Sequence, residues 1–199
     1  MPTTSKMGIV YPSSSDLVKD GATAMGTIST TVDAKTGLVL LNTTSFSAVA
    51  SQAINTVFNT NFAYYLIMYD LTAVTADGSL SIKLRNGTTD ASTNYNLSGI
   101  FGSNATVSGE VSSGATSYIV SCLDAGNNGQ YYSGIIELFN PFLAQRTQIQ
   151  HRAQGYLSNG NRYVSIYGAN HDVASSYDGY NLIASAGAIS GVVKTYGFN

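Results

Sequence analysis

The sequence has no tryptophan, a single cysteine and few charges, and each shortage excludes a class of protein. Cys122 has no second cysteine to pair with, so no disulfide within the chain holds the fold together. We predict that Cys122, which lies in the apolar run SYIVSCL, is a buried thiol of the core. The nine Lys and Arg residues form no basic cluster. Because nucleic-acid binding depends on clustered cations that contact phosphates, we expect no nucleic-acid partner.

Long apolar runs are also missing, and so are common catalytic motifs. No stretch of about 18 apolar residues occurs, so we expect no transmembrane helix and no membrane insertion. The first residues, MPTTSKMGIVYP, lack the apolar core of a secretory signal. The motifs G-x-S-x-G and H-E-x-x-H and any Gly-Lys pair are absent, which argues against an α/β-hydrolase, a zinc protease and a Walker A nucleotide site.

The few residues able to do acid–base or metal chemistry are scattered. His151 and His171 are the only two histidines, and each stands beside a charged residue, so we predict that both are solvated in loops. We therefore expect no metal, no cofactor and no enzymatic activity. A hydrolase that uses acids near aromatic residues, namely Asp70, Glu137 or Asp178, is kept as a minor alternative.

What the sequence does contain is Ser, Thr, Asn, Gly and 14 Tyr residues, arranged in alternating strand-like runs. In 79–89, for example, we expect Leu80, Ile82 and Leu84 to point to one side of a half-buried strand. Ser81, Lys83 and Arg85 are then expected to face solvent on the other side. We predict an all-β fold, an antiparallel, jelly-roll-like β-sandwich, with loops and one short strand in 90–116. The other expected strands are 37–51, 61–75, 79–89, 117–126, 131–140, 147–157, 161–170 and 190–199.

The segment 1–37 differs from the rest, and we treat it as an attachment and oligomerisation segment that precedes a β-sandwich domain at 38–199. After a candidate N-cap at Asp16, apolar residues recur at helical spacing, which predicts a short helix or an extended arm. Gly21 and Gly26 weaken such a helix, so it needs a partner, either its own domain or a neighbouring subunit. The residues of this stripe are Leu17, Val18, Met25, Ile28 and Val32.

Tyrosines beside Asn- and Asp-rich turns form a second candidate site. A tyrosine ring can stack on a sugar face while amides bond the hydroxyl groups. The alternative is that these tyrosines lie in strands, at a subunit contact or inside the sandwich. The candidate glycan contacts are Tyr131, Tyr132, Tyr177, Tyr180 and Asn170.

The leading residues GIVYPSSSDLVKDGA follow a pattern, G-x-x-Y-P then S/T-D-x-V-x-D-G-A, that resembles the start of fibre-like surface proteins of tailed bacteriophages, especially phages of cyanobacteria and actinobacteria. The block TGLVLLNTTSFSAVASQAINTVFNTNFAYYLIMYDLTA and the ending SGVVKTYGFN are also similar to such proteins. The resemblance implies a jelly-roll-like homotrimer on the virion exterior, a short fibre, appendage or capsid decoration, without catalytic residues and assembled in the host cytoplasm. Its implied partners are capsid, neck or tail proteins and a host-surface polysaccharide. The alternative is a carbohydrate-binding, lectin-like module without a virion role.

Overall fold

The computed structural model describes residues 21, 23, 25–28, 37–125, 131–157 and 160–198. Within the segment that precedes the strands, Gly21, Thr23 and residues 25–28 are helical, and Thr27 Oγ1 donates a 2.9 Å hydrogen bond to the Thr23 carbonyl. Residues Leu40–Phe198 form one compact unit. The predicted division after residue 37 stays a prediction.

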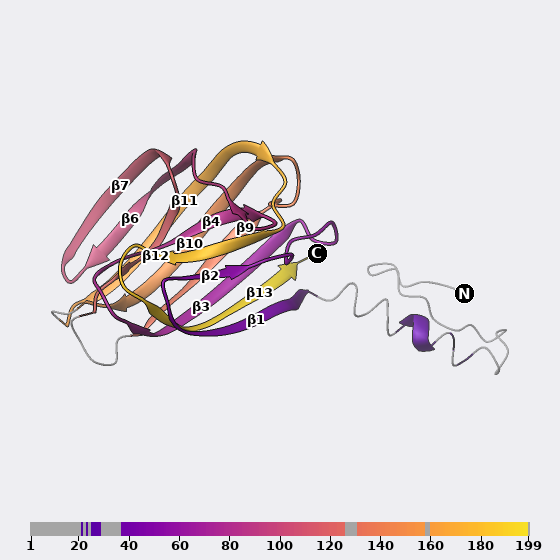
Figure 1. Ribbon diagram of the computed structural model, residues 1–199, viewed down its shortest axis with the longest axis horizontal. Coiled ribbons are helices and arrows are strands. Elements are labelled where there is room, and N and C mark those ends of the chain that lie inside the picture. The colour runs from indigo at the N-terminus through magenta and orange to yellow at the C-terminus, as the bar shows by residue number, and fades with distance from the viewer. Residues whose placement is uncertain are drawn as a thin grey trace. The chain divides into compact units, whose positions relative to one another are not determined.

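Thirteen strands occur among the described residues, in two sheets (Figure 1). The large sheet has eight strands in the order β1-β13-β3-β9-β10-β11-β6-β7, and the small sheet has the order β2-β12-β4-β5 with β8 paired to β4. The strands are β1 (Leu38–Val49), β2 (Ser51–Ile54), β3 (Tyr64–Val74), β4 (Gly78–Asn86), β5 (Thr89–Asp90), β6 (Tyr95–Ser103), β7 (Thr106–Ala115), β8 (Tyr118–Leu123), β9 (Tyr132–Phe139), β10 (Gln145–Tyr156), β11 (Arg162–Ser175), β12 (Gly179–Ala184) and β13 (Ile189–Phe198).

Strands β2 to β13 pair in antiparallel fashion, and the side chains facing inward between the sheets form one core. Alternation decides which side chains these are, since successive residues of a strand point to opposite faces. In β4, Leu80, Ile82 and Leu84 are fully buried, as the sequence predicts. The β-sandwich is therefore confirmed.

The path of the chain between the sheets bears on the finer topology. The first four strands alternate between the large and the small sheet, and β12 and β13 do the same at the end. Such alternation is typical of two-sheet Greek-key sandwiches, of which the jelly roll is one. The alternation favours the jelly-roll-like order, which stays a prediction. The strands β6, β7, β10 and β11 all belong to the large sheet and make it wider than the small one.

Two expectations about the strands are wrong. Residues 90–116 were expected to be loops with one short strand, but they form the long β6–β7 hairpin, with β6 paired along β11. The sequence hides this hairpin because its glycines and serines have low intrinsic strand preference, and the pairing with β11 supplies the missing stability. The strand β12 was not expected either, although it occupies the middle of the small sheet.

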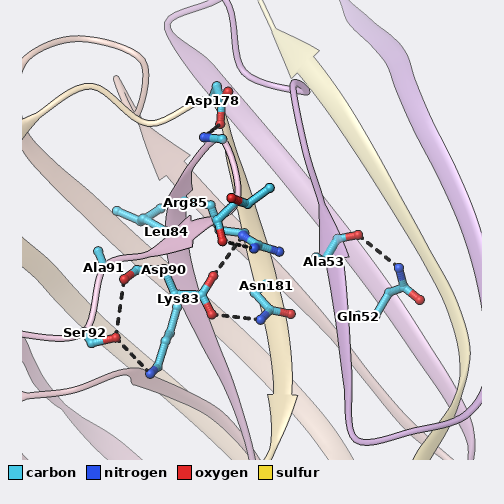
Figure 2. Close-up of polar contacts among 12 residues, drawn as sticks. Gln52, Ala53, Lys83, Leu84, Arg85, Asp90, Ala91, Ser92, Asp178 and Asn181 are labelled. Carbon is cyan, nitrogen blue, oxygen red and sulfur yellow. Dashed lines mark hydrogen bonds and ion pairs between the residues drawn. The ribbon is translucent and has the colours of Figure 1, made fainter.

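The outer side of the small sheet is more buried than the sequence predicts, and its polar side chains bond to one another (Figure 2). Ser81 and Arg85 are buried, and the Arg85 guanidinium forms a 2.8 Å ion pair with Asp90 across the β4–β5 hairpin. Asn181 Nδ2 donates to the same carboxylate at 2.9 Å, and Lys83 Nζ donates to Ser92 Oγ at 3.2 Å. The polar side chains on this face bond mainly to one another, so they leave few groups for a ligand.

In the large sheet, β7 is the edge strand at the border opposite β1 (Figure 1). None of its residues is fully buried. Glu110 is half-buried and accepts a 2.6 Å hydrogen bond from Tyr167 Oη. Burial, together with this carboxylate, raises the pKa of Tyr167.

Candidate functional site

Three of the tyrosines predicted to contact a glycan are core residues, so that prediction is wrong for them. Tyr132 and Tyr180 are 0% exposed and Tyr177 is 5% exposed. Their hydroxyls bond inside the protein: Tyr132 Oη donates to the Tyr156 carbonyl at 2.6 Å, and Tyr180 Oη lies 2.7 Å from Thr195 Oγ1. The neighbouring turns suggested exposure, but strand pairing turns the rings of Tyr132 and Tyr180 inward, and Tyr177, between β11 and β12, packs against His171.

The other two candidates, Tyr131 and Asn170, are accessible but line different hollows. Tyr131 is 61% exposed and borders a hollow of about 380 Å³ together with Tyr156 and Arg162. Asn170 is half-buried in β11 and lines a second hollow of about 570 Å³ on the large sheet. The structure therefore does not bring the five candidates together.

Only part of the predicted N-terminal stripe can be placed. Met25 is 67% exposed and Ile28 is half-buried, and both belong to the helical residues. Leu17, Val18 and Val32 lie outside the described residues. The role of the stripe in assembly stays a prediction.

Both histidines are buried in strands and not solvated in loops. His151 lies in β10 with Nδ1 2.6 Å from Tyr118 Oη and Nε2 3.2 Å from Ser165 Oγ, and its ring stacks on Tyr167 at 5.0 Å between centroids. Burial lowers the pKa of His151 to about 3. His171 is also buried, which lowers its pKa, and its Nδ1 lies 3.2 Å from Tyr177 Oη.

The remaining reactive groups do not converge. Cys122 is half-buried and not part of the core, and burial raises the pKa of its thiol. Asp70 and Glu137 lie on the outer side of the large sheet, whereas Asp178 Oδ1 accepts a hydrogen bond from the Gly87 amide beside the small sheet. Among the described residues, no group of three His, Cys, Asp or Glu side chains is arranged to hold a metal ion.

The side chains that point away from the core of the large sheet make up its outer face, and strand register arranges them in rows. Each row runs across the strands, because residues paired in adjacent strands stand side by side on the same face. Two rows differ sharply in chemistry. One contains Lys194, Met68, Ile135, Arg152, Ile166 and Ile100, and the other contains Phe198, Tyr64, Phe139, Gln148, Asn170 and Asn96.

The first of these rows contributes to an exposed apolar patch. Its large side chains are about half exposed, for example 50% for Ile166 and 51% for Ile100, which are paired directly across β11 and β6. Met68, Ile135, Val164 and Ile166 also line a groove of about 740 Å³. We define the apolar patch as Met68, Ile100, Val107, Ile135, Val164 and Ile166.

The second row, which we call the amide–aromatic row, changes character along its length. Phe198, Tyr64 and Phe139 form a ladder of rings, with centroids 5.8 Å and 5.0 Å apart in turn. The row then continues into the amides of Gln148, Asn170 and Asn96. These amides border the 570 Å³ hollow, and Gly168 forms part of its lining.

Asp172 holds the two asparagine amides of the hollow in place. Its carboxylate accepts a 2.8 Å hydrogen bond from Asn96 Nδ2 and another from Asn170 Nδ2, and it pairs with Arg146 Nε at 3.3 Å. The positive charge of Arg146 is thereby balanced. The Gln148 and Gln150 side chains are exposed and make no hydrogen bond to another residue that the structure describes.

Charge beside the row is balanced as well. Glu137 Oε1 lies 3.8 Å from Arg152 Nη2. Burial raises the pKa of Tyr64 to about 12, and the hydrogen bond to Glu137 adds to this, so Tyr64 stays a neutral phenol. The outer face therefore offers amides, rings and methyl groups more than net charge.

A signal for this face was present in the sequence of β10. Glutamine or arginine occupies every second position from Gln148 to Gln154, while Ile149, His151 and Ala153 alternate inward. That pattern indicates a strand with a polar outer side. The rows, however, depend on which strands are neighbours, and the sequence of one strand does not contain this information.

Comparison of this chain with protein-family models, with curated protein sequences and with solved structures finds no match in any of the three. In the part of the chain that the structure describes, no helix is both long and apolar enough to cross a membrane.

Proposed function

We propose that this chain is a non-enzymatic structural protein that assembles with copies of itself, as a homotrimer, on the exterior of a tailed phage particle. The observation that carries the assembly is the apolar patch on the outer face of the large sheet. Monomeric soluble proteins rarely leave large apolar side chains contiguous and exposed, and such patches usually mark contacts with other proteins. The placement on a virion rests on the resemblance of the leading segment and of two further blocks to phage surface proteins.

The chemistry of the patch fits contact between copies. Met68 and Ile135 are paired across β3 and β9, and Ile166 and Ile100 across β11 and β6, so the methyl groups form a nearly continuous band. Arg152 interrupts the band, but its head group is directed to Glu137. Burying this band against another subunit removes apolar surface from water at little cost in unpaired charge.

Light scattering coupled to size exclusion tests the assembly. We expect a mass of three chains for the wild type and a mass of one chain for Ile100→Glu and for Ile166→Glu, because each places a carboxylate in the patch. Leu143→Glu is the matched control, since Leu143 is 49% exposed but lies in the turn between β9 and β10. A wild-type monomer with intact β-sheet circular dichroism would refute the assembly.

The virion placement needs a separate experiment. Antibody labelling of purified phage particles that carry this chain, followed by electron microscopy, should place it on the exterior at the capsid, neck or tail. Absence of label from intact particles would refute the placement and leave the assembly untouched.

A carbohydrate-binding module without a virion role is the second candidate function. The amide-lined hollow on the large sheet favours it, because exposed amides held on a rigid strand are suited to sugar hydroxyls. If the chain is monomeric, absent from particles and still binds glycan, this candidate replaces the first.

A further inference from the structure

We infer that the hollow over Gly168, together with the ring ladder beside it, binds an uncharged oligosaccharide that lies along the amide–aromatic row. This inference deepens the carbohydrate-binding candidate above, on which it rests, and it is independent of the proposed assembly, because the amide–aromatic row and the apolar patch share no residue.

The depth of the site comes from a missing side chain. Gly168 lies in the middle of β11, between Gln150 on one side and Ser98 on the other. A Cβ placed on Gly168 would meet no atom within 4 Å, so the space above this residue is open. The neighbouring side chains of β10 and β6 stand around this opening and form its walls.

Part of the hydrogen-bonding capacity in the hollow is left for a ligand. Asn96 is occupied, because its Nδ2 donates to Asp172 and its Oδ1 accepts 2.9 Å hydrogen bonds from Ser113 Oγ and the Gly114 amide. Asp172 also fixes the Asn170 amide, which reduces the entropy that a ligand has to offset on binding Asn170. Gln148 and Gln150 are exposed, and each offers both a donor and an acceptor. Paired donors and acceptors of this kind match the hydroxyl groups of a sugar, which also donate and accept.

The ring ladder supplies the apolar part that sugar recognition needs. Phe139 stands next to Gln148 in the row, followed by Tyr64 and Phe198. Aromatic side chains offer a stiff, flat surface against which the C–H face of a sugar ring can pack. The six residues come from six adjacent strands, so the row spans roughly 24 Å, five strand spacings of about 4.8 Å each. That length suits a chain of several sugars better than a single one.

Charge balance selects the class of ligand. Arg146 is paired with Asp172, and Arg152 with Glu137, so each cation beside the row has a carboxylate next to it. A uronate or a sulfate would therefore meet a negative charge beside each cation and gain little net attraction. We therefore commit to a neutral oligosaccharide, and an acidic glycan is one of the outcomes that the experiment distinguishes.

The experiment is a titration of the full chain with neutral hexasaccharides of glucose, mannose, galactose and N-acetylglucosamine, followed by calorimetry, with hexagalacturonate as the acidic comparison. We expect saturable binding of at least one neutral hexasaccharide. Gly168→Val fills the hollow without a clash at Cβ and should abolish this binding. The matched control is Gly109→Val, on the outer face of β7, where the nearest atom to a new Cβ is a carbonyl oxygen 3.9 Å away.

Two further variants test the row itself. Gln148→Ala should weaken binding about tenfold, which corresponds to the loss of about one net hydrogen bond. Gln154→Ala is its control, because Gln154 lies on the same strand and face but does not line the hollow. Phe198→Ala removes the far end of the ladder and should weaken a hexasaccharide while leaving a trisaccharide unaffected.

Four results would overturn the inference: no binding of any neutral hexasaccharide, binding of hexagalacturonate alone, binding that Gly168→Val leaves intact, or equal loss in both glycine variants. Circular dichroism and the mass from light scattering are recorded on the same samples. A monomer that binds sugar refutes the assembly and keeps the hollow, whereas a trimer that binds none does the reverse.

Discussion

Tyr180 follows Asp178-Gly179, and Tyr131 follows the Gly- and Asn-rich sequence AGNNGQ, yet one lies in the core and the other in solvent. Tyr180 is fully buried, stacks on Phe58 at 5.9 Å between centroids, and shares a hydrogen bond with Thr195. Tyr131 is 61% exposed. The composition of the preceding residues does not decide this difference. Tyr180 lies in β12 with its ring on the inward face, whereas Tyr131 precedes the first residue of β9.

Alanine substitutions should separate these two tyrosines by stability. Tyr180→Ala should lower the free energy of unfolding by about 3–5 kcal/mol, since it removes a buried ring and leaves a cavity. Tyr131→Ala, the matched control, should change it by no more than about 0.5 kcal/mol. Urea unfolding followed by circular dichroism measures both values. Equal effects would mean that the ring of Tyr180 is not in the core.

His151 should make stability depend on pH. The folded-state pKa is about 3, below the ordinary value of 6.5, so the unfolded chain binds the proton more readily. The stabilisation by neutral His151 is therefore complete above pH 6.5 and is lost as the pH falls from 6.5 toward 3. Tyr118 and Tyr167 contact the ring and offer no counter-charge to an imidazolium.

The test is urea unfolding of wild type and His151→Gln at pH 7.5 and pH 5. The wild type should lose about 2 kcal/mol more than the variant over this range, at about 1.4 kcal/mol per pH unit below 6.5. His171, whose pKa is also lowered by burial, still titrates in the variant, so the pH dependence is reduced and not abolished. If the wild type and His151→Gln lost the same free energy of unfolding between pH 7.5 and pH 5, His151 would not be the group responsible.

At the scale of elements, the two glycines Gly99 and Gly168 serve opposite purposes on paired strands. A Cβ on Gly99 would lie 2.4 Å from the Ile166 carbonyl oxygen and 2.7 Å from Tyr167 Cα, so β6 approaches β11 too closely for a side chain there. Gly168 faces open space. One glycine lets two strands approach, and the other leaves room above the sheet.

Gly99→Ala should therefore destabilise the protein by about 1–3 kcal/mol, because the new methyl group overpacks the contact between β6 and β11. Gly168→Ala should leave stability unchanged or raise it by about 0.5–1 kcal/mol, since alanine costs less conformational entropy in a strand than glycine. Thermal unfolding by calorimetry compares the two. A stable Gly99→Ala variant would show that the strands can separate without cost.

The elements also show how far the sequence leads. The alternation in 79–89 predicts β4 correctly, because the period of a strand is a local property of the sequence. The hairpin of β6 and β7 was missed, since it depends on β11, some 60 residues away in sequence, through pairs such as Ile100 with Ile166. The amide–aromatic row was beyond prediction for the same reason, as its members come from six strands.

At the scale of the whole molecule, the apolar patch predicts how the proposed assembly responds to salt. Apolar burial is not screened by ions, whereas exposed ion pairs are largely screened at 1 M salt, where the Debye length is about 3 Å. The mass in analytical ultracentrifugation should therefore be the same at 0.1 M and at 1 M sodium chloride. Dissociation at high salt would mean that ion pairs, and not the patch, hold the subunits together.

The edge strand β7 of the large sheet bears on whether strands of other chains can pair with this sheet. A strand at an edge keeps one row of backbone donors and acceptors unpaired, and another chain can extend the sheet there into a fibril or an aggregate. In β7 the carboxylate of Glu110 points to the inner face of the large sheet, where it accepts the hydrogen bond from Tyr167. A foreign strand laid beside β7 would have to cover this negative charge. Glu110 thus protects the edge strand β7 against pairing with a strand of another chain.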